Sequence, residues 1–210
     1  KLTADQVELL DSQFYLKKYP DVKVPFSGVC NACLWTGKQM AAFEWFKPQD
    51  LIQDHETGQG KAFPTFAYGC IVAEVEVDMK TGYVDVLEVT ASHDVGTAIN
   101  PALVKGQIYG GIVMGQGFAV TEDVVTGKRG QKTKNFDSYI LPTSMDAPKM
   151  NINIYENQDP AGTYGAKSIG EPATEGVGAA IANAIFNATG RRVYENPADL
   201  ETVLLGHKLQ

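Results

Sequence analysis

The 210-residue sequence contains only three cysteines, Cys30, Cys33 and Cys70, and no apolar run of about 18 residues. An odd, small number of cysteines is not typical of the disulfide framework of a secreted protein, so we expect a reducing, cytoplasmic location. Without a long apolar run we expect no membrane span. The N-terminal residues also lack the basic start and apolar stretch of a signal peptide.

Basic residues are in the minority. The sequence has 18 Lys and Arg against 25 Asp and Glu, which gives a net charge of -7. Binding to a nucleic-acid backbone needs clustered Lys and Arg, so we expect no nucleic-acid partner. Apolar residues make up 44% of the chain and charged residues 20%, which is typical of globular proteins, and the length suffices for one large or two small domains.

Alternation of apolar and polar residues predicts a long β-hairpin at about 69–95. Two long helices are expected at about 101–121 and 172–189. Asn100 is a suitable N-cap for the first of them, and Pro101 suits its first position. We therefore predict an α+β fold in which antiparallel strands pack with these two helices.

The segment Asp54–Gly60 is rich in glycine and polar residues and is the expected boundary within the chain. We expect residues 1–60 to form an N-terminal segment that completes the domain, and residues 61–210 to form its C-terminal portion. The segment "FYLKKYPDVKVPFSGVCNACLWTGKQM" predicts a strand, a turn and a short helix. Because no second Cys or His pair accompanies Cys30 and Cys33, we interpret them as small buried residues on that helix.

The predicted helix at 101–121 is unusually rich in glycine. Each glycine in a helix interior costs roughly 1 kcal/mol relative to alanine. Close approach of another backbone, or of a ligand, is the usual reason for such positions. The glycines concerned are Gly106, Gly110, Gly111, Gly115 and Gly117.

The segment "GAKSIGEPATEGVG" places the carboxylate of Glu171 directly before Pro172, at an expected helix start. The helix dipole favours an ionised carboxylate there, whereas burial would raise its pKa, and a general base near neutral pH needs such a balance. The alternative is that Glu171 only complements the dipole. Ala166 separates Gly165 from Lys167, so the segment is not a P-loop. It is either an ordinary loop or a backbone nest for an anion.

Three segments, in this order and spacing, resemble the final part of the molybdenum hydroxylases, the family of xanthine dehydrogenase and aldehyde oxidoreductase. The first, "FAYGCIVAEVEVDM" onward, spans residues 66–123 and includes "KGQIYGG". The second is "NFDSYILPTSMDAP", and the third spans residues 165–204 and contains the "GEP" triplet with Glu171. The resemblance runs from about Glu44 to Leu204.

The resemblance implies a molybdenum-dependent oxidoreductase that hydroxylates an N-heterocycle or an aldehyde at a C–H carbon, with water as the oxygen source. It implies Mo-molybdopterin, in the cytosine dinucleotide form, with the metal held through the pterin rather than by residues of this chain. It also implies that Glu171 is the general base. The residues that it places beside the cofactor are Gln107, Lys167, Ser168, Ile169 and Gly170.

The molybdenum-binding portion of that family is far longer than this chain. The resemblance therefore implies a split subunit that works beside a larger molybdenum-subunit chain, an iron–sulfur subunit with its clusters and an FAD subunit, and that acts on a small-molecule substrate. Two alternatives remain open. The chain could be a non-catalytic structural subunit of such a complex, or an unrelated small-ligand or anion-binding module.

Overall fold

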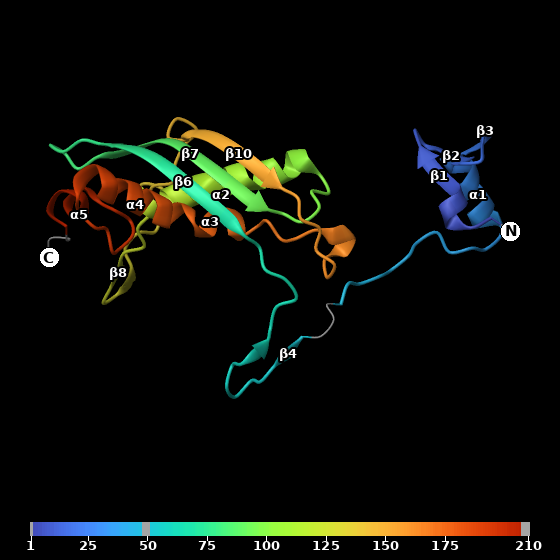
Figure 1. The fold of residues 1–210 in the computed structure, drawn as a ribbon, viewed down its shortest axis with the longest axis horizontal. Coiled ribbons are helices and arrows are strands. Elements are labelled where there is room, and N and C mark those ends of the chain that lie inside the picture. The colour runs from blue at the N-terminus through green and yellow to red at the C-terminus, as the bar shows by residue number, and fades with distance from the viewer. Residues whose placement is uncertain (1, 48–50, 207–210) are drawn as a thin grey trace. The chain divides into compact units, whose positions relative to one another are not determined.

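The computed structural model describes residues 2–47 and 51–206, which belong to two compact units that divide after Lys47 (Figure 1). The division lies upstream of the loop Asp54–Gly60, where the sequence predicts a boundary. That loop instead connects two short paired strands, β4 (Ile52–Gln53) and β5 (Gly60–Lys61).

The N-terminal unit combines a small antiparallel sheet with one helix. A 3-10 helix (Ala4–Gln6) is followed by the paired strands β1 (Val7–Leu10), β2 (Gln13–Leu16) and β3 (Tyr19–Pro25), and then by α1 (Phe26–Trp35). The predicted strand, turn and short helix are present, but a further strand, β3, which the sequence did not indicate, lies between the turn and the helix. Cys30 and Cys33 lie on α1 as predicted, but the prediction that they are buried is wrong. Both are half-buried, and no residue of α1 is fully buried.

The second unit is built on a three-stranded sheet with the strand order β10-β7-β6. Strands β6 (Gly69–Val77) and β7 (Val84–Asp94) form the predicted antiparallel hairpin, with a register shift at Glu74/Val75. Strand β10 (Lys149–Tyr155) joins β7 in parallel, from the pair Lys149–Glu88 to the pair Tyr155–Asp94.

Helices cover one face of this sheet (Figure 1). Helix α2 (Pro101–Val120) has the predicted bounds, and the side chain of Asn100 accepts a hydrogen bond from the amide of Leu103 at 3.1 Å. The core between sheet and helices consists of buried aliphatic side chains, of which each Val or Ile contributes about 1.5–3 kcal/mol on burial. Among them are Val89 and Ala91 of β7, Ile108 and Ile112 of α2, and Ile181 and Ile185.

The second predicted helix, 172–189, is not continuous. It consists of α3 (Pro172–Glu175) and α4 (Val177–Thr189), which break at Gly176. At this point the chain packs closely on β6, since a Cβ on Gly176 would lie 3.1 Å from the Cδ1 atom of Ile71. The low helix propensity of glycine and this close approach together account for the break.

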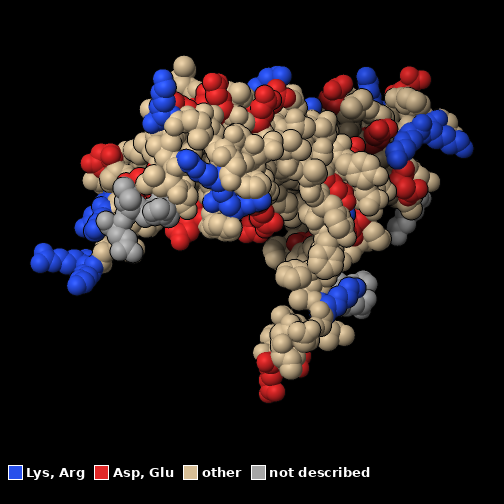
Figure 2. Space-filling view, turned by 60° about the vertical axis from the view of Figure 1, so that its left-hand side comes forward, with Lys and Arg blue, Asp and Glu red and all other residues tan. Residues whose placement is uncertain are grey.

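The remaining elements are short. They are β8 (Thr126–Gly127), β9 (Gly130–Gln131), a 3-10 turn (Thr163–Gly165) and α5 (Leu200–Leu205). Within residues 2–47 and 51–206, no helix combines the length and apolar character needed to cross a bilayer. On the face shown in Figure 2, acidic and basic side chains are interspersed and much of the surface is uncharged.

Candidate functional site

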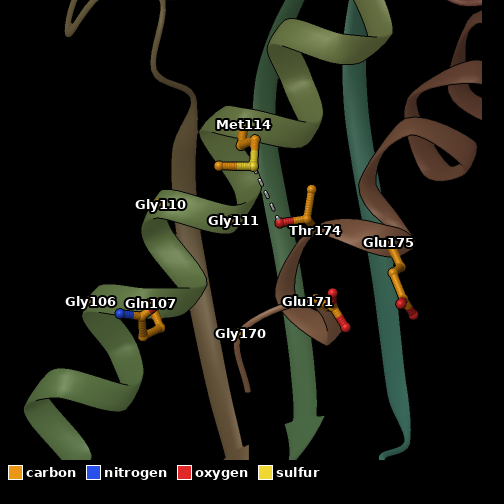
Figure 3. A pocket seen from close by; sticks show the side chains of 9 residues that line it. All are labelled: Gly106, Gln107, Gly110, Gly111, Met114, Gly170, Glu171, Thr174 and Glu175. Atoms are coloured by element: carbon orange, nitrogen blue, oxygen red, sulfur yellow. Dashed lines mark hydrogen bonds between the residues drawn. The ribbon is translucent and has the colours of Figure 1, made fainter. Parts of the chain in front are cut away.

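A groove of about 750 Å³ lies between α2 and the segment that leads into α3 (Figure 3). Its volume falls in the range of small-molecule sites, roughly 300–1,000 Å³. One wall comes from α2 and the other from the residues around the start of α3. The lining residues are Gly106, Gln107, Gly110, Gly111, Met114, Gly170, Glu171, Thr174 and Glu175.

Four of the five glycines of α2 fall into two sets, and a Cβ on the fifth, Gly117, would clash with the side chains of Glu122 and Pro142. A Cβ on Gly111 would lie 2.6 Å from the Cβ of Ala173, and one on Gly115 would lie 2.5 Å from the Cβ of Val177. The predicted close approach of another backbone is confirmed at Gly111, where a Cβ would also lie 2.8 Å from the carbonyl oxygen of Ala173, whereas at Gly115 the close neighbour is the side chain of Val177. A Cβ on Gly106 or Gly110 would meet nothing within 4 Å, so these two glycines leave the helix backbone open to the groove.

Glu171 lies at the start of a helix of only four residues. Its carbonyl oxygen accepts hydrogen bonds from the amides of Thr174 at 2.9 Å and Glu175 at 3.2 Å, and its side chain makes no capping hydrogen bond in the described structure. The side chain of Glu171 is exposed and lines the groove, a position compatible with a general base as well as with a carboxylate that complements the helix dipole.

Lys167 lies four residues before Glu171, but its ammonium group is turned into the domain. It forms an ion pair with Asp94 at 2.5 Å, both side chains are more than nine-tenths buried, and the ammonium lies over the ring of Tyr68. Burial acts to raise the pKa of the Asp94 carboxyl. The hydrogen bond and charge of Lys167, together with the amide of Gly96, outweigh that effect and hold this pKa below its ordinary value.

The backbone beside Lys167 is also fixed to the end of β7. The Lys167 amide donates to the carbonyl of Val95 at 2.9 Å, and Gly96 forms a β-bridge with Ala166. A backbone nest needs free amides that can point toward an anion, but the amides here donate hydrogen bonds within the chain. Those of Gly165 and Ala166 donate to carbonyl oxygens of the same loop, at 2.9 and 3.1 Å. The anion-nest alternative is thus not supported at these amides.

Only some of the site residues that the resemblance implies lie together in the structure. Gln107, Gly170 and Glu171 line the same groove, whereas Lys167, Ser168 and Ile169 do not. Ser168 is exposed, and Ile169 packs against the hydrophobic core.

Three side chains that line the groove were not indicated by the sequence. Thr174 and Glu175 lie three and four residues after Glu171, a spacing that places them on one helix face and could have indicated them. The hydroxyl of Thr174 approaches the sulfur of Met114 at 4.0 Å across the groove (Figure 3). Met114 lies four residues after Gly110 on α2, so the same periodicity applies to it.

His93, next to Asp94 on β7, is a buried polar residue for which the sequence indicated no role. Neither ring nitrogen has a hydrogen-bond partner among the described residues, and a Cβ on the facing Gly69 would lie 2.8 Å from Nδ1. Burial lowers the pKa of His93, so its ring is neutral near pH 7. Within the described ranges, no group of three or more His, Cys, Asp or Glu side chains could hold a metal ion.

Comparison with known protein families gives a direct match. Residues 1–148 match the family model described as "Molybdopterin cofactor-binding domain". The chain belongs to the molybdopterin cofactor-binding domain family. The matched range includes Gln107 and the whole of α2, and it ends before Glu171.

The relatives of this molybdopterin-binding domain agree with the resemblance to molybdenum hydroxylases. Aldehyde oxidoreductase from Megalodesulfovibrio gigas is 38% identical over 151 residues, which are 72% of this chain and 16% of that protein. A putative xanthine dehydrogenase molybdenum-binding subunit of Escherichia coli is 37% identical over 126 residues, 59% of this chain and 17% of that protein. The chain thus spans about one sixth of the length of these curated relatives.

A solved structure shows the same fold. Quinoline 2-oxidoreductase from Pseudomonas putida 86 matches with a TM-score of 0.68 over 96% of this chain and 25% of that chain. The two sequences are 24% identical, so this likeness concerns the fold alone.

Proposed function

We propose that this chain forms one wall of the Mo-molybdopterin site of a molybdenum hydroxylase and carries its general base, Glu171. The observation that carries the proposal is the shared groove, to which α2 contributes Gln107 and the segment before α3 contributes Gly170 and Glu171. The chemistry proposed is oxidative hydroxylation of an N-heterocycle or an aldehyde at a C–H carbon, with oxygen from water.

The residues of the groove fit one side of a pterin cofactor. The open backbone at Gly106 and Gly110 allows a flat, bulky ligand to lie against α2, where any larger side chain would project into the groove. The amide of Gln107 supplies both a donor and an acceptor, as the polar edge of a pterin requires. We propose the cytosine dinucleotide form, with Gln107 and Gly170 against the cofactor and Lys167, Ser168 and Ile169 supporting the loop behind them.

When bound, the molybdenum centre supplies the two-electron oxidation of the substrate carbon. The task of Glu171 is to accept a proton at a carboxylate oxygen. Pro172 and the two hydrogen bonds to the Glu171 carbonyl fix the backbone from which this side chain projects. A base on a fixed backbone keeps a constant distance to a bound reactant, which is the requirement for efficient proton transfer.

The groove is open in this chain, and we propose that further polypeptide of the molybdenum subunit closes it. Helix α2 exposes large apolar side chains along one stripe, and such exposed apolar surface is typical of an interface. Leu103, Met114 and Phe118 are 69%, 62% and 59% exposed. We further propose, by family membership, an iron–sulfur subunit and an FAD subunit as electron-transfer partners in a cytoplasmic complex.

Substitution of Glu171 by Gln in the assembled complex tests the proposal. The amide cannot accept the proton, so kcat should fall by roughly 10²–10⁴-fold, the usual contribution of a general base. Molybdenum and pterin content, measured by mass spectrometry, should stay unchanged. Glu175→Gln is the matched control, because it removes a second carboxylate of the groove one helical turn away, and its kcat should stay close to that of the wild type.

Full activity of the Glu171→Gln variant would contradict the role of Glu171. A purified complex with neither molybdenum nor pterin would contradict the cofactor site. A complex that contains both and never turns over any N-heterocycle or aldehyde would favour the non-catalytic structural subunit.

A further inference from the structure

We propose that the ion pair between Asp94 and Lys167 is a latch that sets the position of Glu171 relative to α2. Both are positioning residues, since neither lines the groove. The latch itself follows from contacts within this chain. Only its effect on turnover rests on the function proposed above.

Asp94 provides the rigid end of the latch. It is the last residue of β7, the central strand of the sheet, and its amide donates to the carbonyl of Tyr68 at 2.9 Å. One carboxylate oxygen accepts from the amide of Gly96 at 3.0 Å, and the other contacts the ammonium of Lys167 at 2.5 Å. The carboxylate is therefore held in a fixed orientation by the sheet and by the turn that follows it.

Lys167 provides the end that belongs to the functional loop. Its side chain and its amide both bind the end of β7, through Asp94 and Val95. In the described structure, residues 168–170 form no further hydrogen bond before Glu171, and a Cβ on Gly170 would meet nothing within 4 Å. Lys167 is thus the last hydrogen-bonded residue before the proposed base, and only the packing of Ile169 supports the segment between them.

A contribution to stability does not by itself explain this pair. Burying two charges costs about as much free energy as their attraction returns, and well-packed apolar residues can replace a buried pair without loss of stability. A directional contact between two residues far apart in the sequence, by contrast, defines where a loop lies. Misplacement of a reacting group by about 1 Å can cost 10²-fold in rate, so such a contact at this point has a large effect on a proton transfer.

The test uses the double variant Asp94→Asn/Lys167→Met in the assembled enzyme. It removes both charges, so no unpaired charge stays buried, and the introduced carboxamide retains an oxygen acceptor for the Gly96 amide. Hydrogen exchange, followed by mass spectrometry of peptides that cover residues 163–172, should accelerate about tenfold or more at the hydrogen-bonded amides of residues 166 and 167 and stay unchanged in β7. We expect kcat to fall by about 10–100-fold with little change in KM.

Two further variants separate positioning from a general loss of structure. Lys167→Arg keeps a cation that can bind Asp94, although the larger guanidinium must fit a buried position over Tyr68. Its exchange and kcat should therefore lie closer to wild-type values than those of the double variant. Lys149→Met removes the exposed ion pair that Lys149 forms with Glu88 on the same strand β7, and it should change neither measurement.

Unchanged exchange at the amides of residues 166 and 167 in the double variant would overturn the latch, as would a uniform acceleration across the domain. These results are independent of the proposed base. If Glu171→Gln is inactive while the double variant is normal, the latch is wrong and the proposed function stands. If Glu171→Gln is fully active while the loop exchange accelerates, the latch stands and the proposed role of Glu171 as the base is wrong.

Discussion

The α-carbon of Gly96 lies so close to the carbonyl of Gly165 that a Cβ on Gly96 would be 2.2 Å from that oxygen. Gly96 also has a positive φ of 62°, a conformation that L side chains rarely adopt. The end of β7 and the loop before Glu171 therefore cross at a point where only glycine fits.

Substitution of Gly96 by Ala should destabilise the domain by more than the roughly 1–2 kcal/mol of a left-handed conformation, because the backbone of the loop must also move. Chemical denaturation of the variant measures the effect. Gly190→Ala is the matched control. Gly190 has a φ of 73° but no atom within 4 Å of its would-be Cβ, so only the conformational cost applies. Equal losses in the two variants would show that the crossing tolerates a Cβ.

Removing one partner of the buried pair should destabilise strongly. Asp94→Asn or Lys167→Met alone should lower the free energy of unfolding by about 3–5 kcal/mol at pH 7, whereas the double variant should lose much less. The folded-state pKa of Asp94 lies below its ordinary value of 3.8, so its contribution is present above that value and is lost as the pH falls through the folded pKa. The difference between wild type and Asp94→Asn should therefore shrink in acid, as urea titrations at several pH values can measure.

Gly110 should be replaceable at no cost to stability. A Cβ there meets nothing, so Gly110→Ala should raise the free energy of unfolding by up to about 1 kcal/mol through helix propensity. The same methyl group enters the groove, so the molybdenum and pterin content of the purified complex should fall.

Gly111→Ala is the comparison for Gly110→Ala, because Gly111 belongs to the glycines whose Cβ would meet a neighbouring residue. Its Cβ would lie 2.6 Å from the Cβ of Ala173, and overpacking of this kind costs about 1–3 kcal/mol. A gain in stability for Gly111→Ala, or a loss for Gly110→Ala, would contradict the division of the α2 glycines into two sets.

His93 should make the domain sensitive to mild acid. Burial lowers the pKa of the ring from its ordinary 6.5, so the unfolded chain binds a proton more readily and stability falls as the pH drops below that value. The loss between pH 6.5 and 5 is at most about 2 kcal/mol for one group. His93→Leu removes two nitrogens that have no partner among the described residues, and its stability should change less over this interval in thermal or urea unfolding. An unchanged pH dependence in this variant would assign the effect to other groups.

Patterns of neighbouring residues in the sequence correctly predicted the β6–β7 hairpin and the start of α2. The alternation in β6 and β7 and the Asn100-Pro101 pair at the start of α2 are features of neighbouring residues, and both elements have nearly the predicted bounds. The parallel pairing of β10 with β7 joins residues about sixty positions apart, and periodicity does not report which strands become neighbours. The break at Gly176 depends on Ile71 of another strand, which is equally invisible to a local pattern.

The candidate site likewise combines residues that the sequence indicated with a contact between distant residues that it did not. The resemblance to the family indicated Gln107 and Glu171, and the structure places both at one groove. It gave Lys167 a place beside the cofactor, yet its ammonium contacts Asp94, 73 residues earlier in the chain. Nothing in the spacing of these two residues indicates the pair, because it depends on the bridge between Gly96 and Ala166.

The two sets of glycines in α2 bear on how the protein can be engineered. Consensus or propensity-based design improves stability by replacing exposed helical glycines with better helix formers, and Gly106 and Gly110 are the positions such a procedure would select first. If the groove holds the cofactor, each gain in thermal tolerance at these two positions would be obtained at the expense of loading. Screens for a more thermostable enzyme should therefore keep both glycines and test substitutions elsewhere in the chain.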